Sequence, residues 1–233
     1  MASYMKRVAM IGGELTRDER DLFCKAYKHV IDTHRTFWRT ITKEEGSKYV
    51  DPIVKCRASI ELKLEMVIRD VLMVLDDYLI PNATVCESKI VYHKMKGDYN
   101  RYLAEFVPGE KRRIATATAL EAYKIANDAA LTELKSTHPL RLGLALNYSV
   151  FYLEALKCPD YAFDLAKQAL TDAIADLALF PKVSCSESFI IMGLILENLT
   201  LWASSKYDEE ELIDAAEGSK VEEAVEEEIL STS

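Results

Sequence analysis

Four charged residues recur along the segment KMKGDYNRYLAE, residues 94–105. Lys94, Asp98, Arg101 and Glu105 are three or four positions apart, so they share one stripe if the segment is helical. Such a stripe is usually a row of solvated ion pairs, each stabilising the helix by about 0.2–0.5 kcal/mol. It would bind an anion instead if other segments placed further cations opposite Arg101.

A second segment with helical spacing, AYKHVIDTHRTFWR (residues 26–39), carries two such cations. Lys28 and Arg35 are seven positions apart, so two helical turns return them to the same face. For this pair alone, a solvated surface is the better interpretation. Together with Arg101, the two residues would form a cluster of positive charge.

Two later segments each carry one asparagine on an otherwise largely apolar stripe. The stripe in GLALNYSVFYLE consists of Leu146, Asn147, Val150 and Glu154. The stripe in SFIIMGLILENLTLW consists of Ile191, Leu194, Asn198, Leu201 and Trp202. Apolar stripes are more often core than binding site, but a buried asparagine must find hydrogen-bond partners. Its amide offers both a donor and an acceptor, which suits a peptide backbone.

Two basic helices facing these two apolar helices would form an amphipathic groove for an extended phosphopeptide. A phosphoryl group carries nearly two negative charges and three acceptor oxygens. Arginine and lysine would bind it through charge-assisted hydrogen bonds of about 1.5–3 kcal/mol each. Whether the four helices face one another is not determined by these patterns.

Helical periodicity runs through almost the whole chain of 233 residues, and only eight glycines and six prolines interrupt it. We therefore predict an all-α fold of about eight antiparallel helices with short connections. Thr16 is the expected N-cap of the second helix, with Glu19 completing a capping box, and Thr137 is the expected N-cap before Pro139. The expected helices span about 3–11, 16–43, 51–82, 85–107, 110–134, 139–156, from after CPDY to 179, and 184–203.

Composition narrows the function classes. Half of the residues are apolar, as in a globular domain, and no apolar run reaches the length of a membrane span. The five cysteines are scattered without metal-ligand spacing, so we expect reduced thiols and no bound cofactor or metal. None of the four histidines joins a recognised catalytic arrangement, which argues against an enzyme.

The net charge of −9 is located at the C-terminal end of the chain. Residues 206–233 contain eleven acidic residues against two lysines, whereas residues 1–205 contain 27 of each sign. A neutral body argues against general binding of nucleic acid. We therefore predict a helical domain over 1–205 and a flexible acidic tail over 206–233.

Several of these segments resemble the signature sequences of the 14-3-3 phosphopeptide-binding adaptors, in the same order and spacing. They are AYKHVIDTHRTFWR, KMKGDYNRYLAE, HPLRLGLALNYSVFYLE and ENLTLW, and the similarity covers about residues 5–203. The resemblance implies an L- or U-shaped array of nine antiparallel helices, normally a homodimer with one groove per protomer. It also implies an adaptor that docks phosphorylated client proteins and regulates signalling in the cytoplasm, with a nuclear pool as an addition.

The resemblance further implies a role for each groove residue. Lys28, Arg35 and Arg101 would bind the phosphate, and Tyr102 would add its hydroxyl. Asn147 and Asn198 would hold the peptide backbone, and Lys94 matches a lysine at the groove rim. The apolar wall would consist of Leu146, Val150, Ile191, Leu194 and Leu201. Glu154 and Trp202 would contact ligand residues that precede the phosphate.

The chain also departs from the family pattern. It begins about twenty residues late, so the first helix and part of the second are expected to be absent. Phe37, Cys56 and Lys63 replace a small residue, a tyrosine and a glutamate that serve dimer contacts in the family. A monomer or a differently built dimer is therefore the alternative to the usual homodimer. Gly193 and Leu196 replace polar residues of the last helix, which suggests a different groove selectivity.

The acidic tail suggests a second hypothesis, that its phosphorylated end binds in a groove. Its last residues include Ser231 and Thr232, placed one or two positions before the carboxylate like the phosphosite of a C-terminal 14-3-3 ligand. If phosphorylated, they would occupy the groove of the same chain or of a neighbour. A solvated tail without a docked state is the simpler interpretation.

The main alternative to the adaptor is a helical scaffold that binds partner proteins through apolar surfaces without reading phosphate. An adaptor needs Arg35 and Arg101 to bind its ligand, and it binds only the phosphorylated form. A scaffold would bind its partners whether or not they are phosphorylated and whether or not these arginines are replaced. We expect neither nucleic acid nor a membrane among the partners.

Overall fold

The computed structural model describes residues 1–43, 50–179 and 186–204, and this part of the chain contains helices and their connections but no strand. The all-α prediction is therefore confirmed. In chain order the helices are α1 (Ala2–Met10), α2 (Arg17–Lys43), α3 (Val50–Val74), η1 (Leu75–Leu79), α4 (Ile80–Asn82), α5 (Cys86–Phe106), α6 (Gly109–Glu133), α7 (Pro139–Glu154) and α8 (Pro159–Leu179). A further helix covers 186–204.

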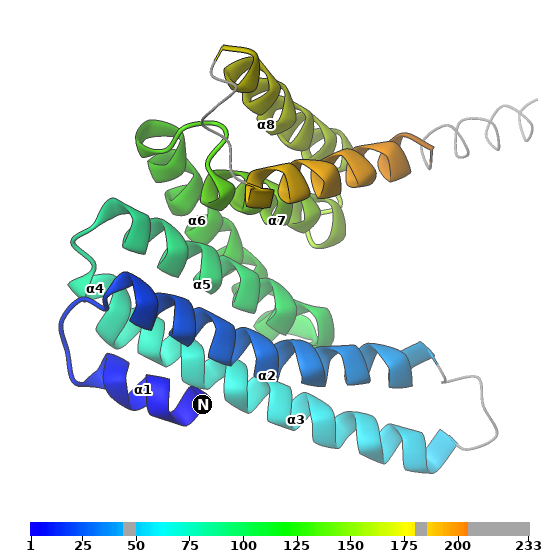
Figure 1. The fold of residues 1–233 in the computed structure, drawn as a ribbon. Coiled ribbons are helices and arrows are strands. Elements are labelled where there is room, and N and C mark those ends of the chain that lie inside the picture. Colours follow the sequence, from blue (N-terminus) through cyan, green and yellow to red (C-terminus); the bar gives the residue numbers. More distant parts are fainter. Residues whose placement is uncertain (44–49, 180–185, 205–233) are drawn as a thin grey trace, which may run out of the picture.

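Neighbouring helices run antiparallel to one another, and α5 lies in the middle of the molecule (Figure 1). On one side of α5 lie α2 and α3 with the short α1 against them. On its other side lie α6, α7, α8 and the helix 186–204. Short connections force consecutive helices to reverse direction, so α2, α5, α7 and the helix 186–204 can border one common space.

The loop before α2 contributes side chains that fix two helix starts, those of α2 and α5. Thr16 and Glu19 form the expected capping box: the Glu19 amide donates to Thr16 Oγ1 (3.3 Å), and the Thr16 amide donates to Glu19 Oε2 (2.9 Å). Glu14 accepts hydrogen bonds from the Thr84 hydroxyl and from the amides of Thr84 and Val85, directly before α5. The Thr84 hydroxyl contributes most to lowering the pKa of Glu14 to about 2.

Two local predictions were incomplete or wrong. The N-cap of α7 is His138 and not Thr137, since His138 Nδ1 accepts from the Leu140 amide (3.2 Å). Pro139 occupies the first helical position, so the residue directly before it must be the cap. The π turn η1, which interrupts the long third helix, had no counterpart in the sequence pattern.

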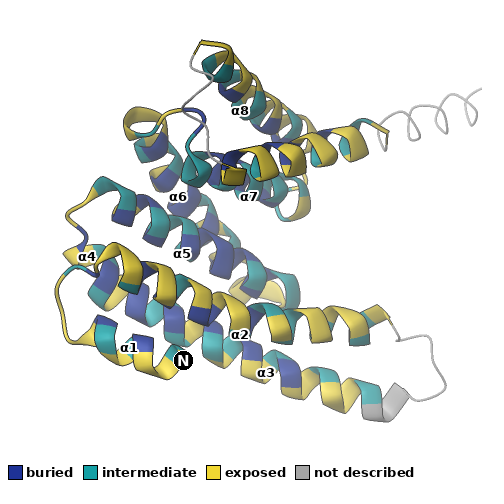
Figure 2. Cartoon of the chain, in the orientation of Figure 1, coloured by how far each residue is buried: buried dark blue, intermediate teal, exposed yellow. Residues whose placement is uncertain are grey.

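Figure 2 marks the buried positions along the helices. Their side chains form three clusters that share helices. The first, with Phe23 and Ile68, joins α1, α2, α3 and α5. The second, with Tyr123 and Phe151, joins α5, α6 and α7, and the third, around Leu142, joins α7 to α8 and the helix 186–204. Each fully buried large apolar side chain contributes about 1.5–3 kcal/mol to folding. The clusters therefore hold α2, α5 and α7 in fixed relation.

Positions that depart from the family pattern lie on the surface. Phe37, Cys56 and Lys63 are exposed on α2 and α3, and Gly193 and Leu196 are exposed on the helix 186–204. The predicted tail 206–233, with Ser231 and Thr232, lies outside the described residues. No helix in the described residues is both long enough and apolar enough to pass through a membrane.

Candidate functional site

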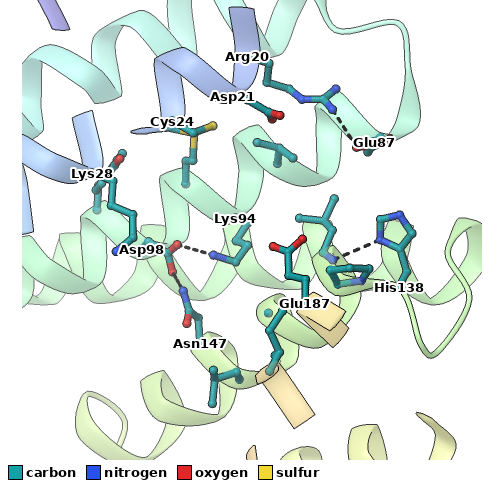
Figure 3. Close-up of a pocket in the computed structure, with 18 of the residues that line it drawn as sticks. Arg20, Asp21, Cys24, Lys28, Glu87, Lys94, Asp98, His138, Asn147 and Glu187 are labelled. Atoms are coloured by element: carbon teal, nitrogen blue, oxygen red, sulfur yellow. Dashed lines mark hydrogen bonds and ion pairs between the residues drawn. The ribbon is translucent and has the colours of Figure 1, made fainter. Parts of the chain in front are cut away.

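A cavity of about 900 Å³ opens between α2, α5, α7 and the helix 186–204 (Figure 3). Both basic segments and both apolar segments contribute to its walls, so these four helices do face one another. Among the predicted site residues, those that line it are Lys28, Lys94, Tyr102, Leu146, Asn147 and Ile191.

Asp98 on α5 is the hub of this cavity. Its Oδ2 accepts from Lys94 Nζ (2.8 Å), and its Oδ1 accepts from the Tyr123 hydroxyl (2.5 Å) and from Asn147 Nδ2 (2.8 Å). Burial alone would raise the pKa of Asp98, but the charges of Lys94 and Arg101 outweigh it and hold this pKa below its usual value. A charged Asp98 thus orients one residue each from α5, α6 and α7 around a single carboxylate.

Asn147 is oriented by this contact. Because its Nδ2 donates to Asp98, its Oδ1 is left to face the cavity as an acceptor. The side chain can therefore accept a hydrogen bond from a peptide N–H. An asparagine at the same place without Asp98 could present either end of its amide.

Arg101 is held from behind and buried. Its Nε donates to the Tyr123 hydroxyl (3.3 Å), and its guanidinium lies over the Tyr102 ring at 4.7 Å from the centroid. Its Nη1 also donates to Glu154 Oε2 at 3.4 Å. Neither Arg101 nor Arg35 is among the residues that line the cavity, but Arg101 lies against Tyr102, which does. Since arginine remains charged at any pH that a folded protein tolerates, a permanent positive charge lies behind this part of the cavity wall.

Arg35 approaches the same tyrosine from α2. Its guanidinium lies 4.0 Å from the centroid of the Tyr102 ring and forms a two-bond contact with the carboxylate of Glu105, which includes Nε to Oε2 at 2.8 Å. Arg39 adds a third donor to Glu105 at 3.3 Å. Burial and the nearby Asp98 raise the pKa of Tyr102 to about 12, so its hydroxyl remains a donor at neutral pH.

Lys28 is the most exposed of the three predicted phosphate-binding cations: its side chain is 69% exposed, against 16% for Arg35 and 7% for Arg101. Its Nζ donates to Asp32 one turn later (2.5 Å). An ammonium at the end of a long, solvent-exposed lysine side chain can adjust its position to an incoming anion.

The other predicted wall residues lie beyond the cavity itself, further along the same two helices. On α7 they are Val150 and Glu154, and on the helix 186–204 they are Leu194, Asn198, Leu201 and Trp202. Leu194 and Leu201 are exposed, as expected of an open apolar wall, whereas Trp202 packs partly against the third core cluster.

Sequence reasoning missed the opposite end of the cavity. Arg20 on α2 is buried and bonds to Ser88 and Glu87 of α5, which ties the two helices together there. Glu187 and His138 line the same end (Figure 3). Arg20 stands four positions before Cys24 and eight before Lys28, so its place on the basic face could have been found from spacing. Tyr123 could not, because nothing in its own helix distinguishes it from a core tyrosine.

The residues around the cavity are poorly suited to metal binding or to nucleophilic catalysis. The part of the chain that the structure describes has no group of histidine, cysteine and acidic side chains that could hold a metal ion. Cys24 lines the cavity, but burial raises the pKa of its thiol to about 11, which makes it a weak nucleophile. Tyr123 also stays protonated, since burial and Asp98 raise its pKa well above the usual value.

Comparison with known proteins agrees with the geometry. The sequence model of a family described as 14-3-3 protein matches residues 1–203. Protein BMH1 of Saccharomyces cerevisiae is 50% identical over 212 residues, which are 88% of this chain and 79% of that protein. A 14-3-3 protein homolog of Candida albicans is 51% identical over 209 residues (87% and 79%), and the 14-3-3-like protein GF14-F of rice, Oryza sativa subsp. japonica, is 48% identical over 227 residues (93% and 87%). The chain belongs to the 14-3-3 family.

Proposed function

We propose that this chain is a non-enzymatic adaptor that binds phosphoserine or phosphothreonine peptides of client proteins in the groove between α2, α5, α7 and the helix 186–204, and thereby regulates signalling in the cytoplasm. One observation carries the proposal. Arg35 and Arg101, from two different helices, stack on the same Tyr102 ring at 4.0 and 4.7 Å. Two guanidinium groups held against one aromatic ring offer donors and positive charge suited to the three oxygens and double charge of a phosphoryl group.

The rest of the groove supports a peptide and not a free phosphate ion. Asn147 offers an oriented acceptor next to the cations, and Leu146 and Ile191 supply apolar surface beside it. A cavity of about 900 Å³ admits several residues of an extended chain. In the proposal, Lys28, Arg35, Arg101 and Tyr102 bind the phosphate and Asn147 binds the adjoining backbone.

The proposal is tested by fluorescence anisotropy with a labelled phosphoserine peptide and its unphosphorylated twin. Wild type should bind only the phosphopeptide. Arg35→Ala should weaken binding by about 2–5 kcal/mol, since it removes one of the cations that bind the phosphate and leaves Glu105 with the longer contact to Arg39. Lys28→Ala should cost less, because Lys28 is mostly exposed. Arg69→Ala, which removes an exposed arginine paired with Glu65 on α3, is the matched control and should change nothing.

One observation favours the second candidate, a scaffold that ignores phosphate. Leu62 and Met66 on α3 are each 67% exposed, and Leu62 lines a smaller hollow of about 300 Å³ with Phe106 and Pro108. Equal binding of both peptides, unchanged by Arg35→Ala, would support the scaffold and contradict the adaptor.

A further inference from the structure

We propose that the hollow between α3 and the start of α6 is a docking surface, and that its occupant is the last part of this chain's own acidic tail, residues 221–230. The hollow shares no lining residue with the cavity of the phosphate groove, so the inference goes beyond the proposed function and does not depend on it. A partner protein that uses this surface must first displace the tail.

The hollow of about 300 Å³ has an apolar lining and an exposed apolar edge. Leu62 is 67% exposed, and Met66, one turn further along α3, is exposed to the same extent. Side chains four positions apart on a helix are neighbours, so Met66 extends the apolar surface beyond the hollow. Large exposed apolar side chains that adjoin a hollow are typical of a surface that another segment covers. The apolar residues of the lining are Ala58, Leu62, Phe106, Val107 and Pro108.

The surface around the hollow carries an excess of positive charge. Residues 53–69 of α3 and 109–114 of α6 contain seven lysines and arginines against three glutamates. Each of these glutamates already pairs with a lysine or arginine of the same two segments. Lys55, Lys63 and Arg112 are exposed and form no ion pair within the described residues. These three cations can therefore pair with carboxylates of another segment.

Residues 221–230, with the sequence VEEAVEEEIL, match this surface in both respects. The segment contains five glutamates and no basic residue. Val221, Val225 and Ile229 are four positions apart, so they would share one face if the segment were helical. An amphipathic helix binds by laying such a face into an apolar groove. With that face on the hollow, the glutamates on either side of it would meet the surrounding cations.

The cations of the phosphate groove are less available to these glutamates. Lys94 is already paired with Asp98. Arg35 is already paired with Glu105. A tail glutamate that bound there would exchange one ion pair for another, whereas at the hollow it forms a new one. The charges of the tail therefore favour the hollow over the groove.

The chain is long enough to reach the hollow. The helix 186–204 ends on the same side of the molecule as α5, whose last residue, Phe106, lines the hollow (Figure 1). Residues 205–220 can extend to about 55 Å, and a domain of this length has a radius of gyration of about 17 Å. Tethering through such a connection gives the segment an effective concentration of about a millimolar at its site. A weak contact is therefore sufficient to keep it docked.

The first test locates the tail by cross-linking the full chain with a carbodiimide, which joins carboxylates directly to lysines, and by mapping the products with mass spectrometry. We expect the tail glutamates to join Lys55, Lys63 and Lys111. A mixture of isotope-labelled and unlabelled chains should show that these cross-links form within one chain. Cross-links to Lys28 or Lys94 instead, cross-links only between two chains, or none from these glutamates to α3 or α6 would overturn the inference.

The second test replaces an apolar residue of the hollow. Leu62→Glu places a carboxylate at an exposed position, where the fold tolerates it and the tail glutamates are repelled. Ile174→Glu, at a position of α8 that is 54% exposed, is the matched control. Both are introduced into the full chain together with Val225→Asp and Ile229→Asp, so that the chain's own tail does not compete with a labelled peptide of residues 217–233.

We expect Leu62→Glu to weaken binding of this peptide at least about tenfold, as when one large aliphatic side chain is no longer covered. Ile174→Glu should bind the peptide as tightly as the chain with the two tail substitutions alone. Equal binding by the two glutamate variants, or no binding of the peptide up to millimolar concentration, would overturn the inference.

Discussion

Asp98→Asn tests whether a buried charge organises the groove. In the variant, the remaining carbonyl oxygen can still accept from the Tyr123 hydroxyl and from Asn147, since both bond to the same oxygen of Asp98. The new amide nitrogen, however, faces the Lys94 ammonium, which was 2.8 Å from the lost oxygen. Two donors then oppose each other at a site where both wild-type side chains are largely buried.

The expected loss of stability can be estimated from the Lys94–Asp98 hydrogen bond, which the variant replaces with two opposed donors. A hydrogen bond between charged groups contributes about 1.5–3 kcal/mol to stability. Lys94 is 20% exposed and can turn partly towards water, which recovers some of the loss. We therefore expect the free energy of unfolding of Asp98→Asn to fall by about 2 kcal/mol at pH 7. Asp164→Asn, at an exposed position on α8, is the control and should match wild type within about 0.5 kcal/mol.

The pH dependence distinguishes the charge from the shape of Asp98. Its pKa is lower in the folded chain than the ordinary value of about 3.9, so its charge stabilises the fold fully above that value. The contribution is lost as the pH falls through the folded pKa. Urea unfolding followed by circular dichroism from pH 7 downwards should therefore show a constant gap between wild type and Asp98→Asn above about pH 5, narrowing below about pH 4. An equal gap at every pH, or none at pH 7, would refute the reasoning.

Two further predictions concern residues packed around the groove. Gly97→Ala should lower the free energy of unfolding by about 1–3 kcal/mol, because the added Cβ would lie 2.8 Å from ring carbons of Tyr123. Gly193 has open space around it, so Gly193→Ala should instead raise the free energy of unfolding by about 0.5–1 kcal/mol. Urea titration measures both changes. With the pKa of its thiol at about 11, Cys24 should react with iodoacetamide at pH 8 far more slowly than the exposed Cys56 and Cys158, as peptide mass spectrometry over time can measure. Equal effects of the two glycine substitutions, or Cys24 labelling first, would contradict these accounts.

The helices were predictable because their signals are local. Few glycines, capping residues such as Thr16 and periodic apolar stripes act within one or two turns. The same holds for Lys28, Arg35 and Arg101 as members of basic faces. The π turn at Leu75–Leu79 was not predictable, because it leaves the apolar period of the long helix almost unchanged.

The orientation of the groove residues depends on contacts between helices, and periodicity does not report them. Sequence alone suggested ion pairs along α5, and only the contact of Lys94 with Asp98 exists in that form. Glu105 pairs instead with Arg35 of α2, and Arg101 contacts Glu154 of α7. A stripe of alternating charges is therefore compatible with partners on the same helix or on its neighbours, and packing decides between them.

Gly97 is the one residue of the local sequence that indicates the contacts around Asp98. A glycine in the middle of a helix costs roughly 0.5–1 kcal/mol relative to alanine, so its presence within α5 needs a compensating contact. Here the Tyr123 ring occupies the space of the missing Cβ. That approach lets the Tyr123 hydroxyl reach Asp98 and Arg101 at once, at 2.5 and 3.3 Å. The glycine beside Asp98 thus marks where α6 must come close enough to set the positions of Arg101, a proposed phosphate ligand, and of the carboxylate that orients Asn147.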